Sequence, residues 1–595
     1  MGIALKINAF AGMIPKLDPR LLPDNASAQA TNTYFYNGKL EGMVSPTFIR
    51  SLTNPSAVYA YRIPLGPTDM AHIENSLWLE FQDVNVNVLK PALIDDQYQR
   101  YYWASDTIQP MYNTLARIQA GQNPLLLGVP RPTNAPGLTT SGGTSIPETR
   151  AYVYTWVTQF GEEGQPSPPS IATAFEDSTW NLTFTSPPAA YINGASGLIT
   201  TTNIYRTVTG VDGTTTYFFV ASVPVTTLSY SDSAPDNIVT ANNELLSTNW
   251  SPPPANLQGW VSMPNGMVAG WDNDANVWFC EPYRPHAWPS IYTVAVDYPI
   301  VGLGVSGQTL VICTEVQPYW GAGVNPSSFT LSKMDSVEPC LSRGSIMSAP
   351  EGVYYASPNG LILVQSGIVT NISRQYMLKD SWLNLSKVNT MRAARLGTGY
   401  YGWGTGTQGV WSSAFDPNSF DQADLSGARQ GLLIDPIDQN VLVSQLSNTD
   451  PTYNTFNDFW TGEVFIIRDG AIYWLNIADT DPVRDVYTWW SKEFQSPNKR
   501  NLGAMKIYFD VTDKLPVLSP IPNTNLIQTL APNQWGLVSL YADGQLVWTR
   551  ELRVSGELMR LPSGFKADFY QLMIQARVTI SNIQVAESAR DLAKV

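Results

Sequence analysis

Three short apolar segments recur at a constant spacing and constrain the fold of this 595-residue chain more than any other feature. They begin at Met267, Leu310 and Val353, each 43 residues after the one before, and a glycine-containing turn precedes each segment. A period of about 40–45 residues with several short strands per unit is typical of β-propeller blades. One blade cannot bury its own faces, so several must stack around an axis. The recurrence predicts an all-β chain with a β-propeller body.

The repeat pattern also predicts how the body is divided along the chain. A similar segment, Ala471 to Leu475, follows an Asp-Gly turn and indicates that the array continues beyond the three best repeats. We expect the first blades in residues 43–145 and the remaining blades in residues 241–499.

Two further modules are predicted from strict alternation of apolar and polar residues, which indicates strands with one buried face. Residues 146–240 alternate in this way around the Gly-rich turns 161–164 and 211–213, and they resemble a fibronectin type III or immunoglobulin-like sandwich inserted into the body. The Pro-rich segments before and after it are predicted to be linkers, at 132–147 and 251–254. Residues 500–595 alternate again and are predicted to form a separate C-terminal β-sandwich.

The N-terminal residues 1–42 are predicted to be an extended arm. Pro15, Pro19 and Pro23 exclude a long helix, and only residues 25–36 could hold a short one, with Asn25 as its cap. Regularly spaced prolines fix an extended backbone at little entropic cost, which suits an arm that lies over a neighbouring subunit.

Charge is scarce and segregated by sign. Only 14% of the residues are charged, against about a quarter in ordinary domains, and the net charge is −14. That excess of acids argues against a protein whose whole surface grips nucleic acid, because such binding neutralises phosphates with Lys and Arg. Between Thr207 and Tyr283 there are seven carboxylates and no Lys or Arg.

Residues 401–466 hold eight carboxylates and a single base, Arg429. They form either a solvated outer face or the wall of a channel that repels DNA phosphates and lets a duplex pass. The candidates for such a channel or gate are Asp416, Asp421, Asp424, Asp435, Asp438 and Asp450.

The C-terminal region is locally positive, with more bases than acids between residues 550 and 577. Together with the N-terminal arm it supplies the candidates for contacts between subunits. These assembly-contact candidates are Pro15, Asp18, Arg20, Arg550, Arg553 and Arg560.

No arrangement of residues predicts catalysis, a cofactor or a bound metal. Cys280, Glu281 and His286 could together hold a metal, but the intervening prolines favour a rigid turn. Asp272 begins a segment that resembles the start of a calcium loop yet lacks its later glycine and glutamate, so a hairpin turn is favoured. We expect the three cysteines to be free and buried. The sequence shows neither a cleaved signal nor a membrane-spanning segment, and we expect a non-enzymatic protein.

Several segments resemble bacteriophage virion proteins. They are 10–23, 281–289, 353–361, 489–494 and 560–565. Together they resemble the tail nozzle, or tail tubular protein B, of short-tailed (podovirus-type) phages. These segments contain structural turns and no diagnostic site, and the sandwich at 146–240 departs from the resemblance as an insertion.

The resemblance implies a structural subunit of the virion tail, made in the host cytoplasm. It implies a homo-oligomeric ring, six-fold as a hexamer, beneath the head-to-tail adaptor of the portal. The centre of that ring would be a gated channel for genome ejection, which double-stranded DNA passes without sequence-specific binding. Tail fibres and the host surface are further implied partners.

Two alternatives belong to other classes of protein. A carbohydrate-binding tail protein would use exposed aromatic residues such as Trp103, Trp156 or Trp320 as platforms for host sugars. A polysaccharide-degrading enzyme would need a pair of acids in one pocket.

Overall fold

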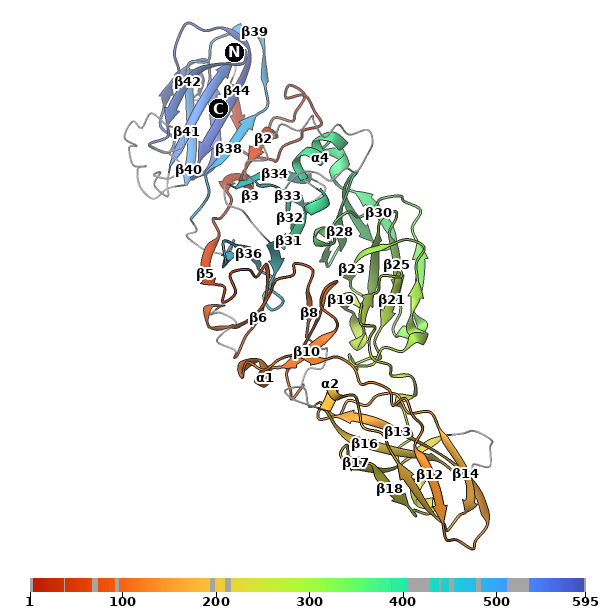
Figure 1. Cartoon of the computed structure of the whole chain (residues 1–595). Coiled ribbons are helices and arrows are strands. Elements are labelled where there is room, and N and C mark those ends of the chain that lie inside the picture. Colours follow the sequence, from red (N-terminus) through yellow and green to blue (C-terminus); the bar gives the residue numbers. More distant parts are fainter. Residues whose placement is uncertain are drawn as a thin grey trace. The chain divides into compact units, whose positions relative to one another are not determined.

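The computed structural model describes residues 4–36, 38–66, 73–90, 96–192, 198–208, 216–386, 388–404, 429–437, 440–448, 454–477, 483–510 and 535–592. Contacts divide the chain into two units, residues 85–335 and the remainder (Figure 1). Almost all regular structure in the described residues is β. The helices are short: α1 (Leu115–Gln119), α2 (Ala189–Ile192), α3 (Asp236–Val239), α4 (Lys379–Ser386) and α6 (Ala589–Leu592). None of these helices is long and apolar enough to cross a membrane.

In the unit formed by residues 85–335, three four-stranded antiparallel sheets have the blade topology, in which consecutive strands are neighbours. The first contains β8 (Asn87–Leu89), β9 (Arg100–Ala104), β10 (Met111–Thr114) and β11 (Leu125–Leu126). The second contains β19 (Gln258–Ser262), β20 (Val268–Trp271), β21 (Asn276–Phe279) and β22 (Val294–Ala295). The third contains β23 (Ile300–Ser306), β24 (Thr309–Thr314), β25 (Tyr319–Ala322) and β26 (Thr330–Lys333).

The other unit contains further blade sheets. One is formed by β27 (Met347–Ala349), β28 (Gly352–Ser357), β29 (Gly360–Gln365) and β30 (Ile368–Asn371). The next is formed by β31 (Arg392–Leu396), β32 (Gly399–Gly404), β33 (Arg429–Ile437) and β34 (Asn440–Asn448). A third is formed by β35 (Asn454–Asn457), β36 (Val464–Arg468), β37 (Ala471–Leu475) and β5 (Thr47–Ser51), and β6 (Tyr59–Ile63) pairs with β7 (Leu77–Phe81).

The predicted recurrence is confirmed. The three segments that begin at Met267, Leu310 and Val353 lie in β20, β24 and β28, and each is the second strand of its blade. The segment beginning at Ala471 is β37, whose outer neighbour is β5, a strand from more than 400 residues earlier. An early strand that completes a late blade joins the two ends of a repeat array, as a closed propeller requires. The predicted fold class, all-β with propeller blades, is therefore confirmed.

The inserted sandwich is also confirmed, with one corrected boundary. One sheet contains β12 (Gly137–Ser141), β15 (Thr179–Thr183) and β18 (Ser229–Asp232). The other contains β14 (Ser170–Phe175), β13 (Pro147–Thr158), β16 (Ile199–Thr207) and β17 (Tyr217–Pro224). The predicted linker at 132–147 contains β12, because its backbone pairs with β15 although its Gly, Thr and Ser side chains look loop-like. The turn predicted at 211–213 lies outside the described residues.

Strands from both ends of the chain build one terminal module. The sequence pattern predicted a separate C-terminal sandwich, but strands from residues 1–42 belong to the same sheets. One sheet has the order β3-β4-β45-β40-β43, with β1 also paired to β45. Its strands are β1 (Ala4–Ile7), β3 (Thr33–Tyr36), β4 (Lys39–Gly42), β40 (Ala504–Asp510), β43 (Met559–Arg560) and β45 (Thr579–Ala586).

The second sheet of this module continues from β31–β34 through β2 into β38, β44, β41 and β42, with β39 on β44. These strands are β2 (Ser27–Thr31), β38 (Tyr487–Ser491), β39 (Phe494–Arg500), β41 (Gly536–Ala542), β42 (Gln545–Glu551) and β44 (Ala567–Ala576). The prediction that residues 25–36 could hold a short helix is wrong. This segment forms β2 and β3, because pairing with β38 and β4 buries Ala30 and Phe35.

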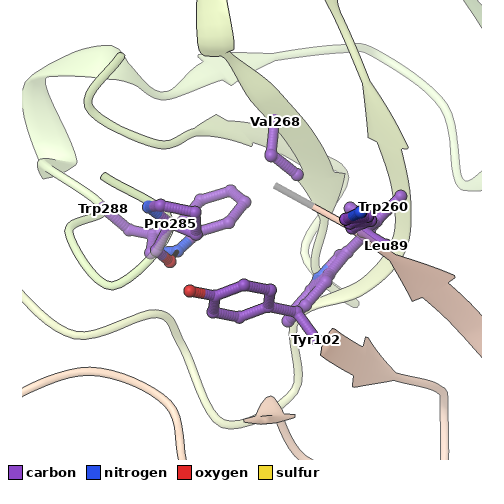
Figure 2. Close-up of a pocket in the computed structure, with 7 residues that line it drawn as sticks. Leu89, Tyr102, Trp260, Val268, Pro285 and Trp288 are labelled. Carbon is purple, nitrogen blue, oxygen red and sulfur yellow. Dashed lines mark hydrogen bonds between the residues drawn. The ribbon is translucent and has the colours of Figure 1, made fainter. Parts of the chain in front are cut away.

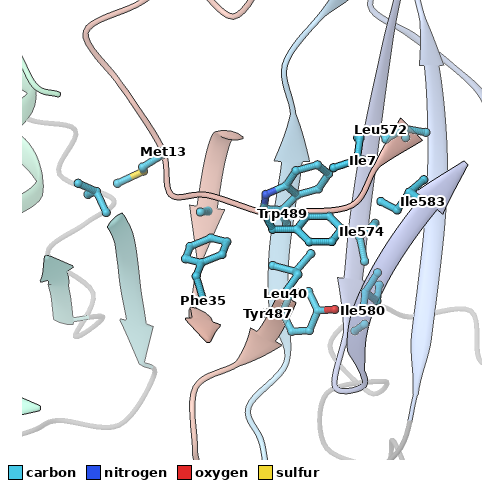
Figure 3. Close-up of a cluster of buried hydrophobic side chains, with 14 of the residues drawn as sticks. Ile7, Met13, Phe35, Leu40, Tyr487, Trp489, Leu572, Ile574, Ile580 and Ile583 are labelled. Atoms are coloured by element: carbon cyan, nitrogen blue, oxygen red, sulfur yellow. The ribbon is translucent and has the colours of Figure 1, made fainter. Parts of the chain in front are cut away.

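Buried apolar side chains from both chain ends hold the terminal module together (Figure 3). Phe10 meets the ring of Trp489 edge to face, with 5.3 Å between centroids. Ile7 and Leu40 join Ile574 in the same cluster, and all three are buried. Each large apolar side chain buried in this way contributes about 1.5–3 kcal/mol. The N-terminal residues are therefore part of this chain's own core.

A buried ion pair connects β6 to the loop after β35. Arg62 donates from Nε to Asp458 Oδ1 at 3.1 Å and from Nη2 to Oδ2 at 2.6 Å. The side chains are 0% and 2% exposed. The Trp460 indole also donates to the Arg62 carbonyl at 2.9 Å. The two-stranded β6–β7 sheet is thereby fastened to the sheet that β5 completes.

Candidate assembly and channel residues

Most of the predicted channel acids, Asp416, Asp421, Asp424, Asp438 and Asp450, lie outside the described residues. Asp435 is on β33 and is buried, and the Thr398 hydroxyl donates to its carboxylate at 2.7 Å. Burial raises the pKa of this carboxyl group. A buried, hydrogen-bonded Asp435 does not contribute an exposed charge to a channel wall in the described chain.

Two other acids of the same stretch also have structural partners. Asp458 is paired with Arg62, and it accepts hydrogen bonds from the Thr461 backbone and hydroxyl at 3.0 and 2.9 Å. Glu463 is half-buried, accepts from the Thr461 hydroxyl at 3.2 Å and has its pKa raised by burial. The described acids of this stretch therefore have partners within the blade sheets and their loops, and the role of the stretch as a channel wall stays a prediction.

The predicted N-terminal contact residues lie in one loop, residues 14–24, which we call the N-terminal loop. Its Asp18 carboxylate accepts from the Arg20 backbone N–H at 2.9 Å and shapes a turn. Arg20 donates from Nε to Glu493 at 2.9 Å and lies over the Phe569 ring at 4.2 Å. Pro15, at the start of the loop, is half-buried.

Further contacts fix the N-terminal loop to the terminal module. Lys492 forms an ion pair with Asp24 at 2.8 Å, and the Glu493 backbone N–H donates to the Pro19 carbonyl at 3.0 Å. Two apolar side chains of the loop remain exposed, Leu17 at 39% and Leu21 at 72%. The N-terminal loop is thus held in place by polar contacts while two of its leucines reach solvent.

The basic C-terminal candidates lie on and after β42, the last strand of its sheet. Arg550 pairs with Glu557 at 2.6 Å, and Arg553 approaches Glu551 at 3.9 Å. Arg560, on β43, is exposed. Exposed apolar side chains lie close by in the sequence: Leu546, Val554 and Leu558. Nearby acids thus compensate part of the positive charge. The outer edge of β42 has no strand beside it in the described residues.

The metal and calcium alternatives are both resolved in favour of turns. The Cys280 thiol accepts from the Val268 backbone N–H at 3.1 Å, and burial raises the pKa of that thiol to about 12. Burial lowers the pKa of His286 to about 3, and its ring meets Trp250 edge to face. No group of three metal-ligating side chains occurs among the residues that the structure describes.

Asp272 closes the hairpin between β20 and β21, as predicted. Its Oδ1 accepts from the backbone N–H groups of Asp274 and Asn276 at 2.9 and 3.0 Å. Its Oδ2 accepts from the Trp278 indole at 2.7 Å. These bonds saturate the carboxylate, so it is the anchor of a turn.

The aromatic platforms of the carbohydrate alternative are mostly unavailable. Trp103 and Trp156 are buried, and Trp156 belongs to the core of the sandwich. Trp320 on β25 is half-buried. Two of the three proposed sugar platforms therefore do not reach solvent.

A small apolar pocket lies between the β8–β11 and β19–β22 sheets (Figure 2). The rings of Tyr102, Trp260 and Trp288 line it together with Val268 and Pro285. Its cavity of about 10 Å³ has room for about one water molecule. A pocket of this size does not bind a metabolite or a sugar.

A buried ionic cluster, which no sequence pattern indicated, fastens the sandwich to the β8–β11 sheet. Glu162, in a segment read only as a turn, accepts from Arg100 at 2.7 Å and from the Tyr112 hydroxyl at 3.0 Å. Arg100 also pairs with Asp96 at 3.0 Å. Burial raises the pKa of Glu162. A carboxylate between two turn glycines gives no local sign that it is buried, because its partner is 62 residues away.

The comparisons with known proteins do not identify a family. No family model matches, and no curated protein matches. Among solved structures, the chain is similar to the BBS1 N-terminal domain in complex with ARL6, at 8% identity over 73% of this chain and 98% of that one, with a TM-score of 0.27. It is also similar to a structure of S. cerevisiae Dbp5 bound to Nup159, Gle1, IP6 and ADP, at 11% identity over 58% and 84%, with a TM-score of 0.23.

A third similar structure is Kluyveromyces marxianus Hsv2, at 9% identity over 56% of this chain and 89% of that one, with a TM-score of 0.22. Scores this low carry no argument about function. The strand topology of the chain itself is the basis for its fold class.

Proposed function

We propose that this chain is a structural, non-enzymatic subunit of the tail of a short-tailed bacteriophage, the tail nozzle. Copies form a six-fold ring beneath the head-to-tail adaptor, and the centre of the ring is the channel through which the genome leaves the virion. Tail fibres and the host surface are further partners in this proposal.

The observation that carries the proposal is the meeting of resembling segments in one module. Segment 10–23 begins with Phe10, which packs on Trp489 of segment 489–494. The same two segments meet again where the Glu493 backbone donates to the Pro19 carbonyl. Segment 560–565 begins with Arg560, the last residue of β43, in the same module. Two of the five resembling segments, 10–23 and 489–494, are thus in direct contact, and a third, 560–565, belongs to the same module, which supports a shared architectural role.

The N-terminal loop supports the same proposal as a contact surface between subunits. Leu21 is 72% exposed, while Arg20 and Asp24 fix the backbone on either side of it. A preorganised apolar contact loses little conformational entropy when it binds. The net charge of −14 supports a conduit to which DNA does not adhere.

Electron microscopy of the purified full-length protein, alone and mixed with an adaptor ring, tests the proposal. We expect rings with a central hole, and we expect Leu21→Asp to shift them toward monomers, because a charge in an apolar interface is costly. Ile368→Asp is the matched control. Ile368 is 66% exposed on β30, so the same charge is added away from the N-terminal loop. Particles without a bore under both conditions would refute the proposal.

A further inference from the structure

The inserted sandwich is held at its joint with the blade sheets, although modules joined by two connections ordinarily move relative to each other. The chain enters the sandwich through residues 127–136 and leaves it through residues 250–257. These two connections touch, because a Cβ on Gly128 would lie 2.5 Å from Pro252. Gly128 has a φ of 92°, a conformation that glycine adopts without strain. The connections are therefore packed side by side and are not free tethers.

The exit connection is also bonded to the β19–β22 sheet. The Ser251 carbonyl accepts from the backbone N–H of Trp288 at 2.7 Å, and the Ser251 hydroxyl donates to the Trp288 carbonyl at 2.7 Å. Trp288 follows β21 and is 1% exposed, in the same core cluster as Trp260 of β19. Three consecutive prolines, 252–254, come after Ser251 and fix an extended backbone. This connection therefore has a defined path from the sandwich to β19.

One end of the sandwich reaches into the apolar core of the β8–β11 and β19–β22 sheets. Leu198, directly before β16, is 1% exposed and lies in the same cluster as Tyr102 of β9. Phe160, in the turn after β13, meets the rings of Tyr98 and Tyr112 edge to face, with 4.8 and 6.0 Å between centroids. An apolar joint that is continuous with a buried core resists relative motion of the two parts.

The Glu162 carboxylate adds a directional lock to this apolar joint. Both of its oxygens accept from the β8–β11 sheet, Oε1 from Arg100 Nη1 at 2.7 Å and Oε2 from the Tyr112 hydroxyl at 3.0 Å. Glu162 is 4% exposed, and Arg100 is itself paired with Asp96 at 3.0 Å. A rotation of the sandwich would part a buried carboxylate from its charge-assisted donors, which is costly where water does not replace them. The cluster is thus satisfied in one orientation of the sandwich.

We propose that the inserted sandwich is a rigid arm of the β8–β11 sheet and that Glu162 is the positioning residue that locks its angle. The apolar joint supplies the contact area, and the ionic cluster selects the orientation. Any surface of the sandwich is then presented at a fixed angle to the blade sheets beside it, and a force on the sandwich is transmitted to the β8–β11 sheet. This arrangement does not depend on ring formation or on a role in a virion.

Pulsed electron paramagnetic resonance on the full-length chain tests this proposal, because it measures the distribution of distances between two spin labels. Thr140→Cys on β12 and Ala116→Cys on α1 place one label on the sandwich and one beside β10, and both positions are exposed. The native cysteines, Cys280, Cys313 and Cys340, are buried and leave the labelling to the introduced thiols. We expect a single narrow distribution in the otherwise wild-type chain.

Three variants of the labelled chain locate the lock. Glu162→Ala and Phe160→Ala should each broaden the distribution at least about twofold, because each removes contacts across the joint. Glu163→Ala is the matched control and should leave the width unchanged. The Glu163 carboxylate accepts from Tyr205 at 2.8 Å and from Asn203 at 3.3 Å, both on β16 of the sandwich itself. Hydrogen exchange in β16 verifies that the sandwich of each variant is folded. A broad distribution in the wild-type chain, or a folded Glu162→Ala or Phe160→Ala that stays as narrow as wild type, would overturn the proposal.

Discussion

The buried pair of Arg62 and Asp458 gives the sharpest prediction about stability. Asp458→Asn preserves the shape of the side chain but removes the carboxylate charge that faces the buried guanidinium of Arg62. Two charge-assisted hydrogen bonds, of 3.1 and 2.6 Å, lose their anionic acceptor. Neither side chain is more than 2% exposed, so water does not replace the carboxylate. Breaking a buried pair in this way costs about 3–5 kcal/mol.

Native-state hydrogen exchange is the suitable assay, because a chain with two units does not unfold in a single two-state transition. At about 1.4 kcal/mol per factor of ten, we expect exchange in β6 and the neighbouring β36 to accelerate by about two to four orders of magnitude. Strands of the inserted sandwich should exchange as in wild type.

Two further variants separate the buried charge from general effects. Lys39→Gln removes one partner of an exposed pair with Asp510, at 2.6 Å, and should cost less than about 1 kcal/mol. Arg62→Met combined with Asp458→Leu removes both charges and should be less destabilised than Asp458→Asn alone. If the amides of β6 exchange no faster in Asp458→Asn than in Lys39→Gln, the reasoning about the buried charge is wrong.

Three other predictions concern pH, backbone conformation and packing. The pKa of Glu148 is raised by burial and by the neighbouring Asp236 carboxylate, so its contribution to sandwich stability should grow as pH falls from neutral toward the ordinary value of 4.5. Thermal unfolding of wild type and Glu148→Gln as a function of pH should show that this dependence disappears in the variant. Gly266→Ala should cost more than about 1 kcal/mol, measured by hydrogen exchange in β20, because φ is 71° and a Cβ would lie 2.4 Å from the Tyr283 ring. Ile574→Ala should destabilise the terminal module by about 2–5 kcal/mol, measured by hydrogen exchange in β44, through the cavity that it leaves among buried side chains.

The fold could be predicted from the sequence wherever local patterns are sufficient. The spacing of β20, β24 and β28 identified the blades, because glycine turns and apolar triplets recur within each repeat. The hairpin of β41 and β42 has an equally local signal, its Asp543-Gly544 turn, in which both residues have positive φ. These features depend on residues that are close in the sequence.

Features that depend on partners distant in the sequence could not be predicted. The pairing of β2 with β38 joins strands separated by more than 450 residues, and nothing in either strand specifies the other. The same holds for the buried carboxylates. In the sequence, Asp435 and Glu162 look like solvated loop residues. Their burial is evident only in the folded chain, where Asp435 accepts a hydrogen bond from Thr398 and Glu162 accepts one from Arg100. A count of charges along the sequence therefore does not reveal that Asp435 is buried.

The joining of strands from both ends has a consequence for how the protein is made. On the ribosome, β1 emerges long before its neighbour β45, so the terminal module cannot form until β45 has been synthesised. Leu21 is held in its displayed position by the Lys492 and Glu493 side of that module. A polypeptide that ends before Lys492 would lack this support and would not hold Leu21 in its displayed position.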